Sequence, residues 1–136
     1  MRLVLDTNVV VSGLLWHGTP RLLLEGARER RVELFTSIPL LAELTETLRR
    51  SKFDNKIAAS LLTVDQIVDG YAALARLVRP IVTPRISSDP DDDVVIGTAL
   101  AAKAESIISG DSHLLELMNF RGIDIVTAAV MVSRIK

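Results

Sequence analysis

The sequence contains no cysteine and only two histidines among its 136 residues. The absence of cysteine excludes disulfide bonds and thiolate zinc sites, and it agrees with a cytoplasmic location. His17 and His113 are too few to build a metal site from imidazoles. Any metal-binding or catalytic site must therefore rest mainly on oxygen-bearing side chains.

Long apolar runs and an excess of positive charge are missing as well. No stretch approaches the roughly 18 apolar residues of a membrane span, and Asp6 and Asn8 interrupt any signal-peptide core at the N-terminus. The formal net charge is −1, so any nucleic-acid binding must come from local basic patches. We expect a soluble, unprocessed protein with no membrane association.

The composition predicts one folded domain. Hydrophobic residues make up 49% and charged residues 24% of the chain, as in ordinary globular proteins. A chain of this length buries roughly two thirds of its unfolded surface on folding, which is enough for a proper core. We therefore expect a single domain spanning residues 1–136.

Apolar segments of strand length alternate with amphipathic helical segments. The predicted strands are Leu3–Leu5, Val32–Thr36, Pro80–Thr83, Ser106–Ile108 and Ile123–Val126. Helices are predicted between the strands, and residues 51–79 are interpreted as a helical insert with helices at Lys56–Leu62 and Val64–Leu77. This alternation predicts an α/β fold in which helices cover both faces of a parallel sheet.

Asp6 directly follows the first predicted strand. Because ligands bind at the carboxyl ends of strands in open α/β sheets, an acid at this point is well placed for chemistry. Aspartate is also a favoured N-cap residue, so Asp6 alone is explained equally well as the cap of the next helix. The other acids of the chain distinguish these two interpretations.

Further carboxylates occur at positions that a parallel sheet brings to the same edge. Asp111 follows the fourth predicted strand, and three consecutive aspartates at 91–93 crowd the start of a helix, which is more than capping requires. Glu43 lies beside the buried stripe of a helix that begins near Ser37. It is either a border residue or a carboxylate that points into a cleft.

A cluster of carboxylates without a thiol nucleophile or a histidine base favours a hard divalent cation held by oxygen ligands and water. Sites of this kind catalyse metal-assisted hydrolysis of phosphodiesters. Local basic groups are candidates for contacts with a phosphate backbone, although they also suit helix ends and solvated surfaces. They are Arg28, Arg30, Arg31, Arg49, Arg50 and Lys52.

Four sequence features in this order resemble the PIN-domain family, particularly the VapC-like toxins of toxin-antitoxin pairs. They are DTNV at 6–9, the helix from Ser37 to Arg50 with Glu43, DPDDD at 89–93, and the strand followed by SGD that ends at Asp111. The similarity covers nearly the whole chain. Many members carry another acid two residues after the last aspartate, where this chain has His113.

The resemblance implies a three-layer α/β/α, Rossmann-like PIN fold with about five strands in the order 3-2-1-4-5. It also implies a Mg²⁺- or Mn²⁺-dependent ribonuclease, with RNA as substrate, a small antitoxin as partner and a homodimer as the assembly. By motif, Asp6, Glu43, Asp93 and Asp111 would be catalytic and would bind the metal. Asp92 fits one form of the family motif about as well as Asp93 fits another.

Two other functions are compatible with parts of the sequence. A haloacid-dehalogenase-type phosphatase also begins with an aspartate after the first strand, but it requires a second aspartate where this chain has Asn8. A module of the same fold that binds a cation or RNA without catalysis is the main alternative. The presence of all four acids argues against that alternative, because an inactive site has no physical reason to keep repelling charges together.

Overall fold

The computed structural model describes residues 1–82 and 89–135. The described strands form one sheet in the order β3-β2-β1-β4-β6-β5. All neighbouring strands are parallel except β5 and β6. The strands are β1 (Arg2–Leu5), β2 (Glu33–Thr36), β3 (Arg76–Leu77), β4 (Ser106–Ile108), β5 (Asn119–Phe120) and β6 (Ile123–Val126).

The helices begin where the sequence supplies helix-starting residues. Proline occupies the first turn of α2, α3 and α6, and Thr63 and Gln66 form a capping box at the start of α5. The helices are α1 (Thr7–Leu15), α2 (Thr19–Arg28), α3 (Ile38–Leu48), α4 (Asp54–Ser60), α5 (Val64–Leu74), α6 (Pro90–Ala102), α7 (Ser112–Leu117) and α8 (Ala128–Ile135). A 3₁₀ turn, η1 (Ser51–Phe53), precedes α4.

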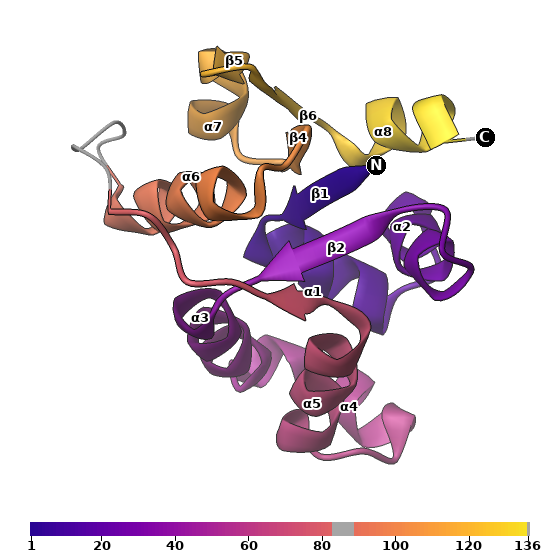
Figure 1. Cartoon of the computed structure of the whole chain (residues 1–136). Helices are drawn as coiled ribbons and strands as arrows, with labels where there is room; N and C mark the ends of the chain where they lie inside the picture. Colours follow the sequence, from indigo (N-terminus) through magenta and orange to yellow (C-terminus); the bar gives the residue numbers. More distant parts are fainter. Residues whose placement is uncertain (83–88, 136) are drawn as a thin grey trace.

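Alternating side chains of the central strands divide the core between the two faces of the sheet. Leu3 and Leu5 of β1 pack in the larger cluster with residues of α1, α2, α3, α5 and α8. Val4 packs on the opposite face with residues of α6 and α7. Figure 1 shows α6 and α7 on the side of the sheet away from α4 and α5. These contacts confirm the α/β prediction, with a sheet enclosed between two layers of helices.

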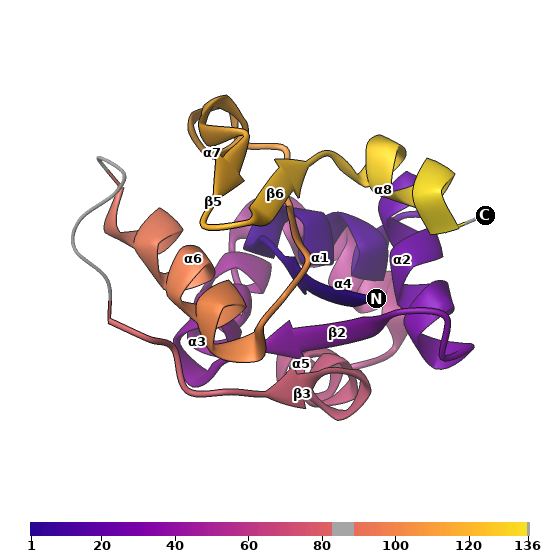
Figure 2. The same ribbon diagram turned by 45° about the horizontal axis from the view of Figure 1, so that its top comes forward.

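The carboxyl ends of the central strands lie at one end of the molecule. In Figures 1 and 2 the arrowheads of β1 and β2 point toward the side on which α3 and α6 begin, and both chain termini lie at the other end. The loops after β1, β2 and β4 therefore meet on the side away from the termini. This is the edge at which the sequence predicts the acidic site.

The third strand is not where the sequence predicts it. The chain leaves helix α5 after Leu74 and forms β3 at Arg76–Leu77, inside the segment predicted as the helix Val64–Leu77. Both residues of β3 are exposed, so this edge strand has no apolar pattern that would reveal it. The prediction of a strand at Pro80–Thr83 is wrong for residues 80–82, and Thr83 lies outside the described residues.

Residues 80–82 do not extend the sheet, and Ile81 bonds to helix α6 instead. Proline has no backbone N–H to donate to a ladder, and the Ile81 N–H donates to the carbonyl of Gly97 in α6 at 3.0 Å. The described sheet has six strands rather than the five predicted, because the two-residue strand β5 adds an antiparallel edge to β6. The predicted order 3-2-1-4-5 holds for the other five strands, with β6 as the last.

The segment 51–79, which the sequence predicts to be a helical insert, contains η1, α4, α5 and β3. No single helix within residues 1–82 and 89–135 combines the length and apolar character of a membrane span. The segments Ser51–Ser60 and Val64–Leu74 are joined at a 75° bend. Taken together, this pair has the length and apolar composition of a membrane span.

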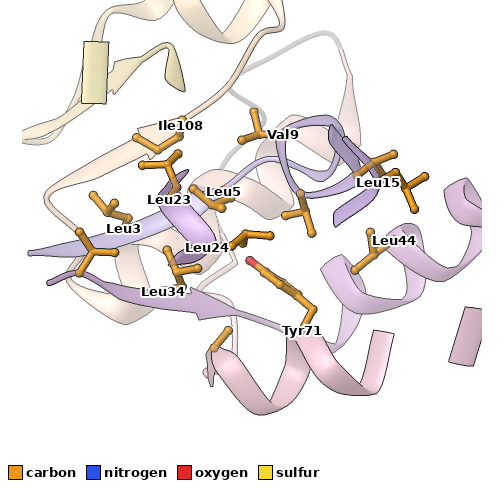
Figure 3. Packing of buried hydrophobic residues seen from close by; sticks show 14 of the residues in the cluster. Leu3, Leu5, Val9, Leu15, Leu23, Leu24, Leu34, Leu44, Tyr71 and Ile108 are labelled. Carbon is orange, nitrogen blue, oxygen red and sulfur yellow. The ribbon is translucent and has the colours of Figure 1, made fainter. Parts of the chain in front are cut away.

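One polar atom inside the larger core has no hydrogen-bond partner among the described residues. Tyr71 of α5 is 3% exposed, and its hydroxyl is unpaired within that part of the chain. Figure 3 shows the hydroxyl pointing toward Leu24 among aliphatic side chains. Burial in these surroundings raises the pKa of Tyr71 well above its usual range, so the group stays neutral.

Replacing Tyr71 with phenylalanine is expected to stabilise the protein by about 1 kcal/mol, because an unpaired buried hydroxyl costs about 1–3 kcal/mol in desolvation. Urea denaturation of the wild type and of Tyr71→Phe measures the difference. Tyr71→Leu is the control, and it should be less stable than both because it removes the ring from the core. A loss of stability in Tyr71→Phe would mean that the hydroxyl has a partner.

Candidate active site

Asp6 lies at the junction of strand β1 and helix α1. Its backbone N–H donates to the carbonyl of Ile108 at 2.9 Å, so the residue is held against β4. Its carboxylate accepts hydrogen bonds from the Thr7 N–H at 2.9 Å and from the Ser109 hydroxyl at 2.8 Å. Asp6 is therefore the N-cap of α1, and it is also a carboxylate at the carboxyl edge of the sheet.

The side chain of Asp6 is in an unfavourable place for a negative charge. Asp6 is only 8% exposed, and this burial is the main reason that its pKa is raised. The hydrogen bonds from Ser109 and Thr7 oppose the shift, whereas the charges of Asp111 and Asp89 add to it. The charges that act on Asp6 are thus carboxylates, and the ionised form gains from a cation nearby.

Glu43 shares this environment from the second turn of α3. Burial raises its pKa to about 7, and the charges of Asp91, Asp6 and Asp89 contribute. A hydrogen bond with the Thr7 side chain lowers the pKa of Glu43 in part. The sequence leaves open whether Glu43 is a border residue or a carboxylate in a cleft. Its coupling to Asp6 brings it into the acidic cluster.

Asp111 joins the cluster through Ser109. The Ser109 hydroxyl donates to Asp6 and accepts from the backbone N–H of Asp111 at 3.0 Å. Asp111 also caps α7, since its carboxylate accepts from the His113 N–H at 2.7 Å. Ser109 is 1% exposed and is not among the residues predicted for the site. Its position directly after β4 and two residues before Asp111 was the available signal.

The aspartates at the start of α6 divide into different environments. Asp89 caps the helix by accepting from the Asp91 N–H at 3.0 Å, and the charges of these two exposed residues act on Glu43. Asp92 is 4% exposed. Asp93 lines a hollow of about 200 Å³ with Pro39, Ile81 and other residues.

The sequence singles out Asp92 and Asp93 from this run. In the structure the charges of Asp89 and Asp91 act on Glu43, and the charge of Asp89 also acts on Asp6. The sequence places Asp91 in the run of acids at this edge but names Asp92 and Asp93 as the candidate ligands, and it does not assign Asp89 to the site. Which aspartate serves as the third acid depends on the rotation of α6, which a run of identical residues does not reveal.

Three of the basic residues considered as phosphate contacts have neighbours outside the acidic cluster. Arg28 lines a hollow with Leu15 and Tyr71, and Arg30 lines another with Arg76. The exposed side chain of Arg49 forms an ion pair with Asp65 at 2.9 Å. Contact of these residues with RNA stays a prediction.

The donor chemistry of the cluster suits a hard cation, since it offers carboxylate and hydroxyl oxygens. In residues 1–82 and 89–135, no three histidine, cysteine, aspartate or glutamate side chains come together closely enough to hold an ion by themselves. Mg²⁺ fits such a site, because it is usually held by one or two carboxylates, several waters and substrate phosphates. Asp6 and Glu43, whose raised pKa values mark them as poorly compensated acids, are the first candidates for these carboxylates.

Together the fold and the acids define an α/β protein with a carboxylate cluster at the carboxyl edge of a mostly parallel sheet. The sequence pattern of the PIN domain matches residues 2–113. The chain belongs to the PIN-domain family, whose members are generally nucleases that depend on divalent metal ions. A search among curated proteins finds no match.

A similar fold occurs in the crystal structure of VapBC2 from Rickettsia felis, which is bound to a DNA fragment from the VapBC2 promoter. The superposition covers 92% of this chain and 97% of that chain, with a TM-score of 0.59 and 14% sequence identity. This similarity supports the assignment of the fold.

The raised pKa of Glu43 predicts how stability depends on pH without metal. Between its ordinary pKa of 4.5 and about 7, the folded protein holds more protons at Glu43 than the unfolded chain does. The contribution of Glu43 to the free energy of unfolding should therefore fall as the pH rises through this window. Thermal melts in chelator from pH 4 to 8 should show a flatter profile for Glu43→Gln than for the wild type. Parallel profiles would show that Glu43 titrates normally.

Proposed function

We propose that this PIN-domain protein is a Mg²⁺- or Mn²⁺-dependent endoribonuclease. The observation that carries the proposal is the joining of Asp6, Glu43 and Asp111, from three separate segments, into one electrostatically coupled cluster. Asp6 and Glu43 are both held where their ionised forms are disfavoured. A protein without use for a cation gains nothing from this arrangement.

Each residue has a distinct part in the proposed chemistry. Asp6 and Glu43 would hold the metal, with Asp111 and an aspartate from 89–93 around it. Ser109 and the Thr7 N–H keep the Asp6 carboxylate in one orientation by their two hydrogen bonds. When bound, the metal lowers the pKa of a water molecule and stabilises negative charge that develops on the phosphate. In hydrolysis the water oxygen forms a bond to phosphorus while the bond to the leaving sugar oxygen breaks.

The proposal extends to the biological role. We propose that the protein is the toxin of a toxin-antitoxin pair, acts in the cytoplasm, and has a small antitoxin and a second copy of itself as partners. The similarity to VapBC2 in fold supports this role. An exposed apolar surface supports partner binding, since Ile38 and Leu77 line one hollow and Ile81 and Val82 line the next.

Cleavage of a mixed RNA pool tests the enzymatic proposal. Purified protein is incubated with Mg²⁺, Mn²⁺ or EDTA, and Asp6→Asn protein purified in parallel controls for contaminating nucleases. Metal-dependent cleavage that is lost in the variant is the expected result. The melting temperature should also rise with metal, because binding to the folded state stabilises it. A rise in melting temperature without any cleavage would instead support a non-catalytic cation-binding module.

A further inference from the structure

A shallow hollow adjoins the acidic cluster on the far side of Ser109. It has a volume of about 300 Å³ and lies between the start of α1, the connection after β4 and the start of α8. Asn8 and Val9 line it from α1, Ser109 and Gly110 from the connection, and Ala129 from α8. The volume is at the lower end of the roughly 300–1,000 Å³ found for small-molecule sites.

Ser109 makes the hollow continuous with the acids. Ser109 lines the hollow, and its hydroxyl donates a hydrogen bond to Asp6 and accepts one from the Asp111 N–H. Ser109 therefore connects the hollow to the Asp6 carboxylate. In an RNA strand, the group next to a phosphate is a nucleoside.

The lining chemistry suits a nucleoside rather than a phosphate. None of the described residues that line the hollow is charged, and Val9, Pro20 and Ala128 give it apolar surface. Its polar groups include the side chain of Asn8, which is exposed and has no hydrogen-bond partner in the described part of the chain. An amide offers both a donor and an acceptor, as needed to pair with the edge of a base or with a ribose hydroxyl.

We propose that this hollow holds one nucleoside of the RNA substrate, next to the phosphate that is cleaved. The proposal rests on the proposed ribonuclease function and adds a substrate subsite to it. In this arrangement the acids and the metal act on the phosphate, and the neutral hollow fixes the neighbouring base and sugar. The hollow thus positions the scissile bond without placing further negative charge beside the polyanion.

A tryptophan at position 129 tests the subsite by filling it. Ala129 is exposed on α8 and lines the hollow, whereas its neighbour Val130 is also exposed but does not line it. Ala129→Trp and Val130→Trp are therefore a matched pair of variants. Binding of a fluorescent oligoribonucleotide is measured by anisotropy in EDTA, with every variant made in the Asp6→Asn background so that neither metal nor cleavage contributes.

Ala129→Trp is expected to weaken binding at least tenfold, whereas Val130→Trp should change it less than twofold. A second measurement uses active protein and oligoribonucleotides that carry one abasic residue at each position in turn. One abasic position beside the cleavage site should slow the wild type and Val130→Trp, but should cause no additional loss in Ala129→Trp. A general structural defect in Ala129→Trp would not abolish the effect of the abasic residue. Circular dichroism of both variants checks that they are folded.

Equal effects of the two tryptophan variants, or fully additive effects of Ala129→Trp and the abasic residue, would overturn the subsite. These outcomes leave the ribonuclease proposal standing as long as wild-type protein still cleaves RNA with metal. Conversely, if wild-type protein neither binds nor cleaves RNA, both proposals fail.

Discussion

Asp6→Asn protein is expected to cleave RNA at least about 100-fold more slowly than the wild type, since removal of one group that stabilises transition-state charge typically costs this much. The variant keeps the shape of the side chain but loses the charge that holds a cation. It should also lose the rise in melting temperature that metal gives the wild type. At a metal concentration of 100 times the dissociation constant, that stabilisation is about 2.7 kcal/mol.

The same variant has an opposite expected effect in chelator. The raised pKa of Asp6 shows that its ionised form is disfavoured in the folded protein, so a neutral asparagine should fold with equal or greater stability at pH 7 without metal. Asp69→Asn, at an exposed position of α5, is the control and should retain full activity. Wild-type rates in Asp6→Asn protein would remove Asp6 from the site.

Gly97→Ala should destabilise the protein by about 3 kcal/mol, at the upper end of the usual cost of overpacking. Gly97 lies in the middle of α6, and a Cβ at this position would collide with the carbonyl oxygen of Ile81. The atom that the added Cβ would meet belongs to the backbone, so no change of side-chain rotamer can relieve the clash. Either residues 80–82 or α6 must move, and movement of α6 also displaces Asp89 and Asp91.

Gly70→Ala is the matched control for this prediction. Gly70 also lies inside a helix, but a Cβ added there would meet no atom within 4 Å, so alanine should stabilise α5 by about 1 kcal/mol through helix propensity. Urea denaturation of both variants separates the steric effect from the general preference for alanine. A stabilised Gly97→Ala would show that residues 80–82 do not pack against α6 in solution.

The elements that the sequence predicted well are those with a complete local signal. Strand β1 and helix α3 have apolar patterns that match their burial, because β1 is buried in the sheet and α3 packs one face, including Leu40, Leu44 and Leu48, on the core. Strand β3 has no such pattern, since both its residues are exposed and only pairing with β2 defines it. The Pro80–Thr83 segment has an apolar composition, but residues 80–82 have α6 as their neighbour in space, which no local pattern reveals.

The predicted site divides along similar lines. The position of Asp6 and Asp111 at one edge of the sheet could be predicted because each follows an apolar strand, and parallel strands bring such residues to one edge. Glu43 could be named as a candidate, but its coupling to Asp6 depends on how α3 packs against α1. The role of Ser109 could not be predicted, because local sequence does not reveal hydrogen bonds between distant segments. The different environments of the aspartates at 89–93 could not be predicted either, because they depend on the rotation of α6.

The hydrogen bond between Ser109 and Asp6 joins residues that are 103 positions apart. Chains are synthesised from the N-terminus at about 5–20 residues per second, so a nascent chain carries Asp6 and Glu43 for several seconds before β4 and Asp111 exist. During that time the acids lack the partner that orients them. The cluster is completed only when the last third of the chain joins the sheet, and a ribosome-bound fragment that ends before Ser109 should be inactive toward the RNA around it.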